Sequence, residues 1–119
     1  MSYIIDWATY DITDIFSPSS VFSMSGKINR QGKFLIGNIT VTRNSGTFGD
    51  FASNIGTFAK GFRPKYGVVT YAVLFSDHTE SATSQTGYCR ADTNGGLVVS
   101  GYGTTGKTRA RIELYYEIA

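Results

Sequence analysis

Short segments rich in β-branched and aromatic residues recur along this chain at intervals of roughly ten residues, and helical periodicity is almost absent. Gly, Asn, Asp and Ser gather between these segments, where turns between strands are expected. Such spacing is typical of an all-β domain built as a sandwich or a barrel. The segments that we expect to be strands are residues 21–30, 34–43, 55–59, 68–75, 88–91, 97–100 and 109–118.

The last of these segments shows the clearest alternation of apolar and polar residues. Its two faces carry Ala110, Ile112, Leu114, Tyr116 and Ile118 on one side, and Arg109, Arg111, Glu113, Tyr115 and Glu117 on the other. Side chains alternate between the two faces of a strand. We therefore expect the first set in the core and the second in water or at an interface, as in an antiparallel sheet.

Turn residues predict how neighbouring strands connect. Gly32 lies at the centre of a turn between residues 21–30 and 34–43, and the pair suggests a hairpin. The Asn94–Gly95 pair predicts a second hairpin, because an Asn-Gly turn favours positive φ. Pro64 cannot donate to a ladder, so it is expected before the strand at 68–75 rather than within it. Nearer the start, Tyr3–Ala8 has strand composition, and Ser17 followed by Pro18 is a pattern that begins helical turns.

Length and composition indicate a single globular domain over residues 1–119, of which residues 1–34 carry the fewest signals. Eleven basic and nine acidic residues give a net charge of +2, which does not favour nucleic acid or an anionic membrane surface as a partner. No apolar run is long enough for membrane insertion, and the acidic start lacks the basic region of a signal peptide. The single cysteine, Cys89, excludes an internal disulfide, fits synthesis in a reducing cytosol and is expected to be buried.

None of the motifs that could carry out chemistry has the sequence context that it requires. Residues 101–108, GYGTTGKT, have the letters of a phosphate-binding loop, but an alternating strand follows them where that loop requires a helix. His78 is the only histidine, and no Gly-x-Ser-x-Gly elbow accompanies it. One histidine and one cysteine do not make a structural zinc site. We therefore expect no enzymatic activity, no metal and no cofactor.

A binding surface is the remaining expectation, because polar loops on a rigid β scaffold commonly carry recognition. Carboxylates, arginine and an aromatic face are groups that can hold a sugar. One polar loop supplies three candidates, the strand after it supplies two, and the only tryptophan is the sixth. The candidate ligand-binding residues are Asp77, His78, Glu80, Tyr88, Arg90 and Trp7. The alternative remains open that the loop is only solvated and that the aromatic residues pack in the core or at an interface.

The order of parts in the second half resembles a known family. Gly61–Pro64, GFRP, forms a corner before a strand, residues 90–99, RADTNGGLVV, form a tight hairpin, and Tyr115 or Tyr116 closes the last strand. In this arrangement residues 35–119 resemble the C-terminal head domains of bacteriophage tail fibres and receptor-binding proteins. The sequence differs from this family in two respects. The sequence has no coiled-coil or repeat typical of a stalk, and the loop at residues 76–87 has no motif to align, so no saccharide-binding residue is carried over.

This resemblance implies an antiparallel β-sandwich, jelly-roll-like, that assembles as a homotrimer about a fibre axis. It implies adhesion to a bacterial surface polysaccharide, contact with other phage tail proteins, and a place in the virion tail after synthesis in the host bacterial cytoplasm. Two other classes remain open at this point. One is a purely structural tail, baseplate or capsid-decoration module, and the other is a cellular carbohydrate-binding module.

Overall fold

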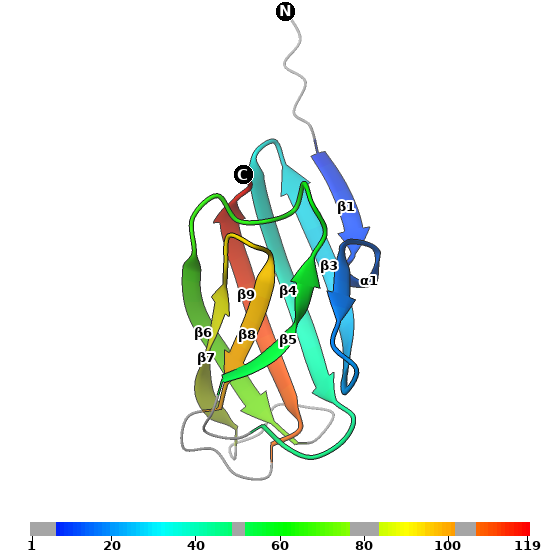
Figure 1. Cartoon of the computed structure of the whole chain (residues 1–119), viewed down its shortest axis with the longest axis vertical. Helices are drawn as coiled ribbons and strands as arrows, with labels where there is room; N and C mark the ends of the chain where they lie inside the picture. The colour runs from blue at the N-terminus through cyan, green and yellow to red at the C-terminus, as the bar shows by residue number, and fades with distance from the viewer. Residues whose placement is uncertain (1–6, 49–51, 77–83, 102–106) are drawn as a thin grey trace, which may run out of the picture.

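The computed structural model describes residues 7–48, 52–76, 84–101 and 107–119, and their strands form one antiparallel sheet (Figure 1). The sheet has nine strands in the order β1-β3-β4-β9-β6-β7-β8-β5-β2. A single helical turn, α1, accompanies them. The elements are β1 Trp7–Asp11, α1 Ile12–Ile15, β2 Phe16–Pro18, β3 Phe22–Gln31, β4 Phe34–Arg43, β5 Ala52–Phe58, β6 Val68–Phe75, β7 Gln85–Ala91, β8 Gly96–Ser100 and β9 Arg109–Glu117. None of the helical structure in these residues is long and apolar enough to cross a membrane.

The two edges of the sheet are neighbours in the sequence. β1 and β2 lie at opposite ends of the strand order, yet only α1 separates them in the chain. Ile12 and Ile15 of α1 are both buried, so this turn is held against the core. The sheet must therefore curl into a half-barrel whose two halves face each other (Figure 1). The prediction of an all-β, antiparallel fold is confirmed. The finer prediction, a jelly-roll-like sandwich with two distinct layers, is not shown by strands that pair continuously in one sheet.

Both predicted hairpins are present. β3 and β4 pair along their full length, from Phe22↔Arg43 to Gln31↔Phe34, around Gly32 with a φ of 60°. β7 and β8 meet at Gly95, whose φ is 91°. Asn94 supports this turn because its side-chain oxygen accepts a hydrogen bond of 2.9 Å from the Gly96 amide. The short strand predicted at residues 55–59 is longer and earlier, Ala52–Phe58.

The helical turn lies elsewhere than the Ser17–Pro18 pattern predicts. Residues 16–18 form β2, which pairs with β5 through Phe16↔Phe58, and the helical turn precedes them at Ile12–Ile15. Pairing with β5 and burial of the Phe16 ring outweigh the local preference of the Ser-Pro pair. Of the stretch Tyr3–Ala8, only its last two residues are described, and they begin β1.

The Gly61–Pro64 corner contacts the second hairpin. Pro64 precedes β6, as predicted, and forms an isolated bridge with Ile118 beyond the end of β9. Arg63 Nε donates a hydrogen bond of 3.0 Å to the carbonyl of Phe58, and the Phe58 amide donates one of 2.8 Å to the carbonyl of Gly95. The Arg63 side chain therefore links the corner to β5, and β5 is in turn hydrogen-bonded to the β7–β8 turn.

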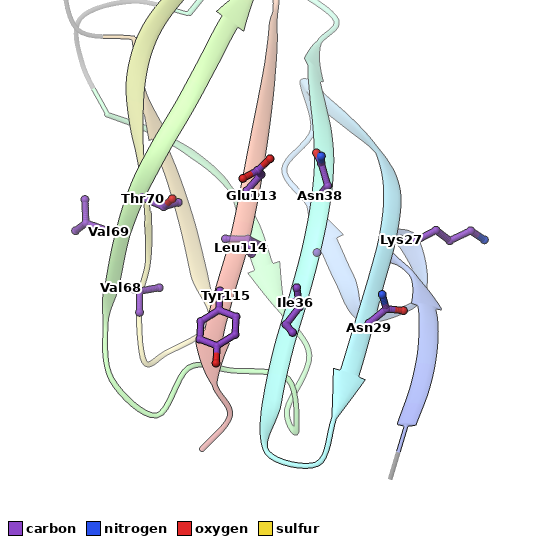
Figure 2. A pocket seen from close by; sticks show the side chains of 11 residues that line it. Lys27, Asn29, Ile36, Asn38, Val68, Val69, Thr70, Glu113, Leu114 and Tyr115 are labelled. Carbon is purple, nitrogen blue, oxygen red and sulfur yellow. The ribbon is translucent and has the colours of Figure 1, made fainter. Parts of the chain in front are cut away.

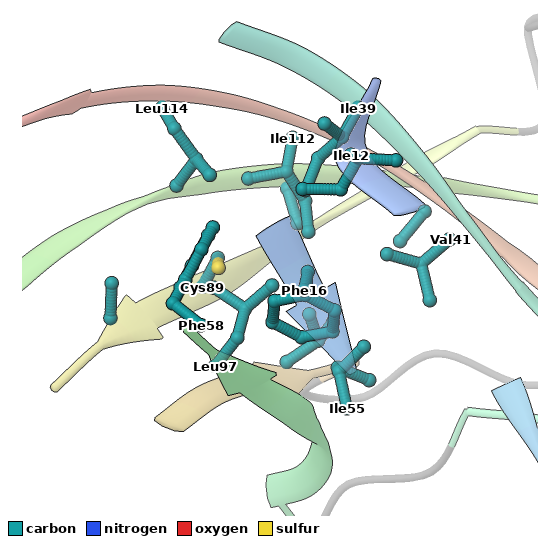
Figure 3. Packing of buried hydrophobic residues seen from close by; sticks show 14 of the residues in the cluster. Ile12, Phe16, Ile39, Val41, Ile55, Phe58, Cys89, Leu97, Ile112 and Leu114 are labelled. Carbon is teal, nitrogen blue, oxygen red and sulfur yellow. The ribbon is translucent and has the colours of Figure 1, made fainter. Parts of the chain in front are cut away.

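The core fills the space between the two halves of the sheet (Figure 3). Ile39 and Ile112 come from one half, and Phe58 and Leu97 come from the other; all four side chains are fully buried. The apolar face of β9 is buried as predicted, and its other face is partly or fully exposed. Cys89 is also buried, and burial raises the pKa of its thiol to about 12. The outward faces of the strands are therefore the surfaces available to bind a ligand or partner.

Candidate functional site

The structure places two of the six predicted ligand residues side by side and separates them from a third. Tyr88 and Arg90 lie on the outward face of β7, where Tyr88 is opposite Tyr71 and Arg90 is opposite Val69 on β6. Arg90 Nε donates a 2.9 Å hydrogen bond to a carboxylate oxygen of Asp92, so its charge is already paired. We call Val69, Tyr71, Tyr88 and Arg90 the β6–β7 face.

The other four predicted residues do not join this face in the described part of the molecule. Trp7 begins β1 at one edge of the sheet, with β3, β4, β9 and β6 between it and β7. Asp77, His78 and Glu80 lie outside the described residues. The prediction that these loop residues bind a ligand therefore stays a prediction.

A groove that the sequence did not predict lies on the outward side of the sheet (Figure 2). It has a volume of about 820 Å³. Its lining comes from four strands: Lys27 and Asn29 of β3, Ile36, Gly37 and Asn38 of β4, Val68, Val69 and Thr70 of β6, and Glu113, Leu114 and Tyr115 of β9. We call this feature the outer groove.

The outer groove exists because β6 and β9 diverge. Their ladder covers only Ala72–Phe75 on β6 and Arg109–Ile112 on β9. Beyond Ile112, β9 continues to Glu117 beside β4, whereas β6 turns away (Figure 2). Val68 and Thr70 point toward the space between the strands, and their partial exposure follows from the missing neighbour on that side.

An aromatic platform forms the floor at one end of the groove. The ring of Tyr115 is stacked on that of Phe34, with centroids 5.8 Å apart and an angle of 19° between the planes. Tyr115 is 63% exposed, which is unusual for so large a side chain on a strand. Ile36 lies directly opposite Tyr115 in the β4–β9 register and extends the apolar floor (Figure 2).

Polar side chains form a row beside this floor. Lys27, Asn38 and Glu113 are successive cross-strand partners on β3, β4 and β9. The ammonium of Lys27 forms an ion pair with Asp11 of β1, and this hydrogen bond and charge raise the pKa of Lys27. Figure 2 shows the Lys27 side chain directed away from Tyr115. Asn38 and Glu113 therefore supply the polar groups nearest the centre of the groove.

Asn29 has a defined orientation at the edge of the groove. Its side-chain oxygen accepts a hydrogen bond of 2.8 Å from the Thr9 hydroxyl on β1. That bond uses the amide oxygen and not the amide nitrogen, so the nitrogen can donate to a ligand. Oriented amides, a carboxylate and an aromatic ring are groups that can bind a ligand.

Five large apolar side chains are exposed on the described surface, and two of them, Val69 and Tyr115, line this groove. The five are Phe34 on β4, Val69 and Tyr71 on β6, Tyr115 on β9 and Tyr66 in the loop before β6. A cluster of exposed apolar side chains marks a surface that contacts another molecule. Within the described residues no group of three or more histidine, cysteine or acidic side chains is placed to hold a metal ion.

Sequence reasoning missed the outer groove because its residues are scattered over four strands. The alternation in residues 109–118 did predict that Glu113 and Tyr115 face outward, in water or at an interface. The same alternation in the β3–β4 hairpin identifies the outward residues that could lie beside Glu113 and Tyr115. The divergence of β6 from β9, however, has no local signature.

By sequence, no family model and no curated protein matches the chain. Comparison with solved structures finds the crystal structure of the head domain of phage bIL170, reported in the context of a common fold for the receptor binding domains of lactococcal phages. The likeness has a TM-score of 0.62 and covers 97% of this chain and 99% of that one, at 14% sequence identity. The chain has the fold of a phage receptor-binding head domain.

The resemblance inferred from the turn motifs is thus confirmed at the level of the fold. It extends over nearly the whole chain, including most of the first 34 residues, which brought no motif to it. At 14% identity the shared property is the backbone arrangement.

Proposed function

We propose that this chain is a non-enzymatic adhesion module of a bacteriophage tail, which recognises a bacterial surface saccharide as a trimeric head. The observation that carries the proposal is the receptor-binding head-domain fold over nearly the full length of both chains. The module belongs in the virion tail beside other tail proteins, after synthesis in the host bacterial cytoplasm. In finer description, the two halves of its curled sheet act as the layers of a jelly-roll-like sandwich.

A saccharide suits the outward surface better than a charged or wholly apolar ligand. That surface combines exposed aromatic rings with amide, hydroxyl and carboxylate groups, such as Tyr115, Asn38, Thr70 and Glu113. Aromatic faces pack on the C–H side of a sugar ring, and the polar groups donate to or accept from its hydroxyls. Single sites of this kind are weak, and a trimer gains avidity on a repeating polymer without any new contact.

Trimer assembly is supported by the exposed apolar side chains. Val69 and Tyr71 are 71% and 78% exposed, respectively, and lie on the same strand. Their burial between copies would remove apolar surface from water, which stabilises association. A closed ring of copies needs only one such heterologous contact repeated around an axis.

Binding to intact bacteria tests the adhesive role. A fluorescently labelled chain is mixed with a panel of bacteria that includes lactococci, before and after mild periodate oxidation of their surface glycans. We expect saturable binding to some strains and its loss after oxidation. Binding that survives oxidation would point to a receptor other than a saccharide, and no binding to any strain would favour a purely structural tail module.

Sedimentation equilibrium over a dilution series tests the assembly. The chain has a mass of 13.0 kDa, so a trimer gives three times that value. A chain that binds surface glycans but remains a monomer at all concentrations would favour a carbohydrate-binding module without the trimeric arrangement.

A further inference from the structure

We infer that the saccharide is held in the outer groove, with a ring on Tyr115, and that the groove selects neutral glycans over acidic ones. This inference rests on the proposed function, since it names the site and the class of glycan for that adhesion. It assigns to Tyr115, Asn38, Asn29 and Glu113 roles that the sequence did not suggest.

Shape is the first reason to choose the outer groove over the β6–β7 face. The groove is concave because β6 leaves β9 after Ile112, and it is lined from both sides. Concave sites bury more of a small ligand than a flat strand surface does. On the β6–β7 face, by contrast, the most exposed side chain, Tyr71, projects from the strand with 78% of its surface open.

Rigidity of the aromatic platform is the second reason. The Tyr115 ring is supported by the nearly parallel ring of Phe34, and both side chains lie on paired strands. A ring that is already positioned loses little conformational freedom when a sugar packs on it. Such pre-organisation matters most for a weak ligand, because ordering costs would otherwise cancel much of the contact energy.

The arrangement of polar groups is the third reason. Asn38 and Glu113 are directly opposite each other, and Asn29 and Tyr115 both lie opposite Ile36 on its two sides. The Asn38–Glu113 pair and the row formed by Asn29, Ile36 and Tyr115 are neighbours along the strands. Polar groups therefore flank the position of a sugar ring on Tyr115. Amides both donate and accept, whereas a carboxylate only accepts, which matches the donor and acceptor capacity of sugar hydroxyls.

The charges in the groove indicate a neutral ligand. Glu113 places a carboxylate on the floor, and the Lys27 ammonium is paired with Asp11 and points away from Tyr115 (Figure 2). Arg111, the next outward residue of β9, has interactions of its own and is not part of the lining. A uronate or phosphate group on the ligand would therefore meet a like charge, which disfavours binding.

The test is a titration of the labelled chain, followed by NMR, with maltotriose, N,N′,N″-triacetylchitotriose and trigalacturonate as probes. We expect at least one neutral trisaccharide to shift the amides of Asn38 and Tyr115, and trigalacturonate to shift neither. Tyr115→Ala should weaken neutral binding roughly tenfold or more, as expected for the loss of about 1.4 kcal/mol. Glu113→Gln should bring trigalacturonate binding up to the level of the neutral probes.

Tyr66→Ala is the matched control, because Tyr66 is 67% exposed, compared with 63% for Tyr115, and does not line the groove. It should leave neutral binding unchanged, and thermal unfolding checks that both variants fold. If Tyr71→Ala or Tyr88→Ala abolishes binding and Tyr115→Ala does not, the site is the β6–β7 face and the inference is overturned. The same holds if trigalacturonate binds the unaltered chain as tightly as the neutral probes.

Failure of this inference can be told apart from failure of the proposed function. Periodate-sensitive binding to bacteria, combined with no response to any neutral probe, would retain the adhesive role and reject the neutral class. Absence of any glycan-dependent binding to cells would reject the adhesive role itself, and the groove assignment with it.

Discussion

Replacing Gly95 by alanine should destabilise the fold far more than the same change at Gly61. Both glycines have a φ of 91°, so the backbone strain imposed on a new Cβ is alike at the two positions. They differ in their surroundings. A Cβ on Gly61 has no atom within 4 Å, whereas one on Gly95 lies 2.8 Å from the Phe58 carbonyl oxygen and 2.7 Å from Arg63 Nε.

The magnitudes follow from these contacts. A non-glycine residue at positive φ costs about 1–2 kcal/mol, and this should be the whole effect of Gly61→Ala. At Gly95 the backbone oxygen of Phe58 has to shift as well. That shift disturbs the Phe58–Gly95 amide hydrogen bond and the Arg63–Phe58 hydrogen bond. Each is worth about 1 kcal/mol, so Gly95→Ala should cost about 3–4 kcal/mol in total.

The assay is urea unfolding of the two variants and the unaltered chain, monitored by tryptophan fluorescence and by circular dichroism. Agreement between the two probes establishes that one transition is being measured. The difference between the variants, about 2 kcal/mol, isolates the brace between the corner and the hairpin. Equal destabilisation by both alanines would refute the claim that the Gly61–Pro64 corner and the Asn94–Gly95 turn stabilise each other.

Two further predictions concern buried side chains. Because burial raises the pKa of Cys89 from 9.0 to about 12, the folded state keeps the thiol proton after the unfolded chain has lost it. Stability from this group is complete below pH 9 and falls as the pH rises toward 12, by about 1.4 kcal/mol per pH unit. Urea titrations at pH 8 and pH 10 should show this loss, and Cys89→Ala should remove it; an unchanged slope in that variant would contradict the assignment. Tyr116→Phe should cost about 1–2 kcal/mol, because the hydroxyl donates to the carbonyl of Phe62 at the corner and its loss leaves that carbonyl without this donor. A variant as stable as the unaltered chain would show that water replaces the bond.

Local patterns predicted those parts of the fold in which neighbours in sequence are neighbours in space. The β3–β4 hairpin, the β7–β8 hairpin and the two faces of β9 were all predicted, because turn residues and period-2 alternation act over a few residues. The helical turn at Ile12–Ile15 was missed, since tertiary contacts rather than capping residues hold it. Its neighbour Phe16 belongs to a strand for the same reason.

The candidate site shows the same division. The sequence pointed to Tyr88 and Arg90, which do lie together on the outward face of β7 because they are two residues apart on one strand. It could not bring Asn38 and Glu113 together, although they are directly opposite each other in the structure. Residues 38 and 113 meet only because β9 pairs with β4 rather than with its sequence neighbour β8.

Sequence patterns are thus sufficient to predict an all-β, antiparallel protein, its two tight hairpins and the buried side of β9. The order of the strands, the curling that lets α1 join the two edges, and the divergence of β6 from β9 that opens the outer groove arise only in the folded molecule. Alternation and turn chemistry act locally, whereas strand order depends on burial of the whole core. Before β6 begins, Pro64 of the corner pairs with Ile118 beyond the end of β9.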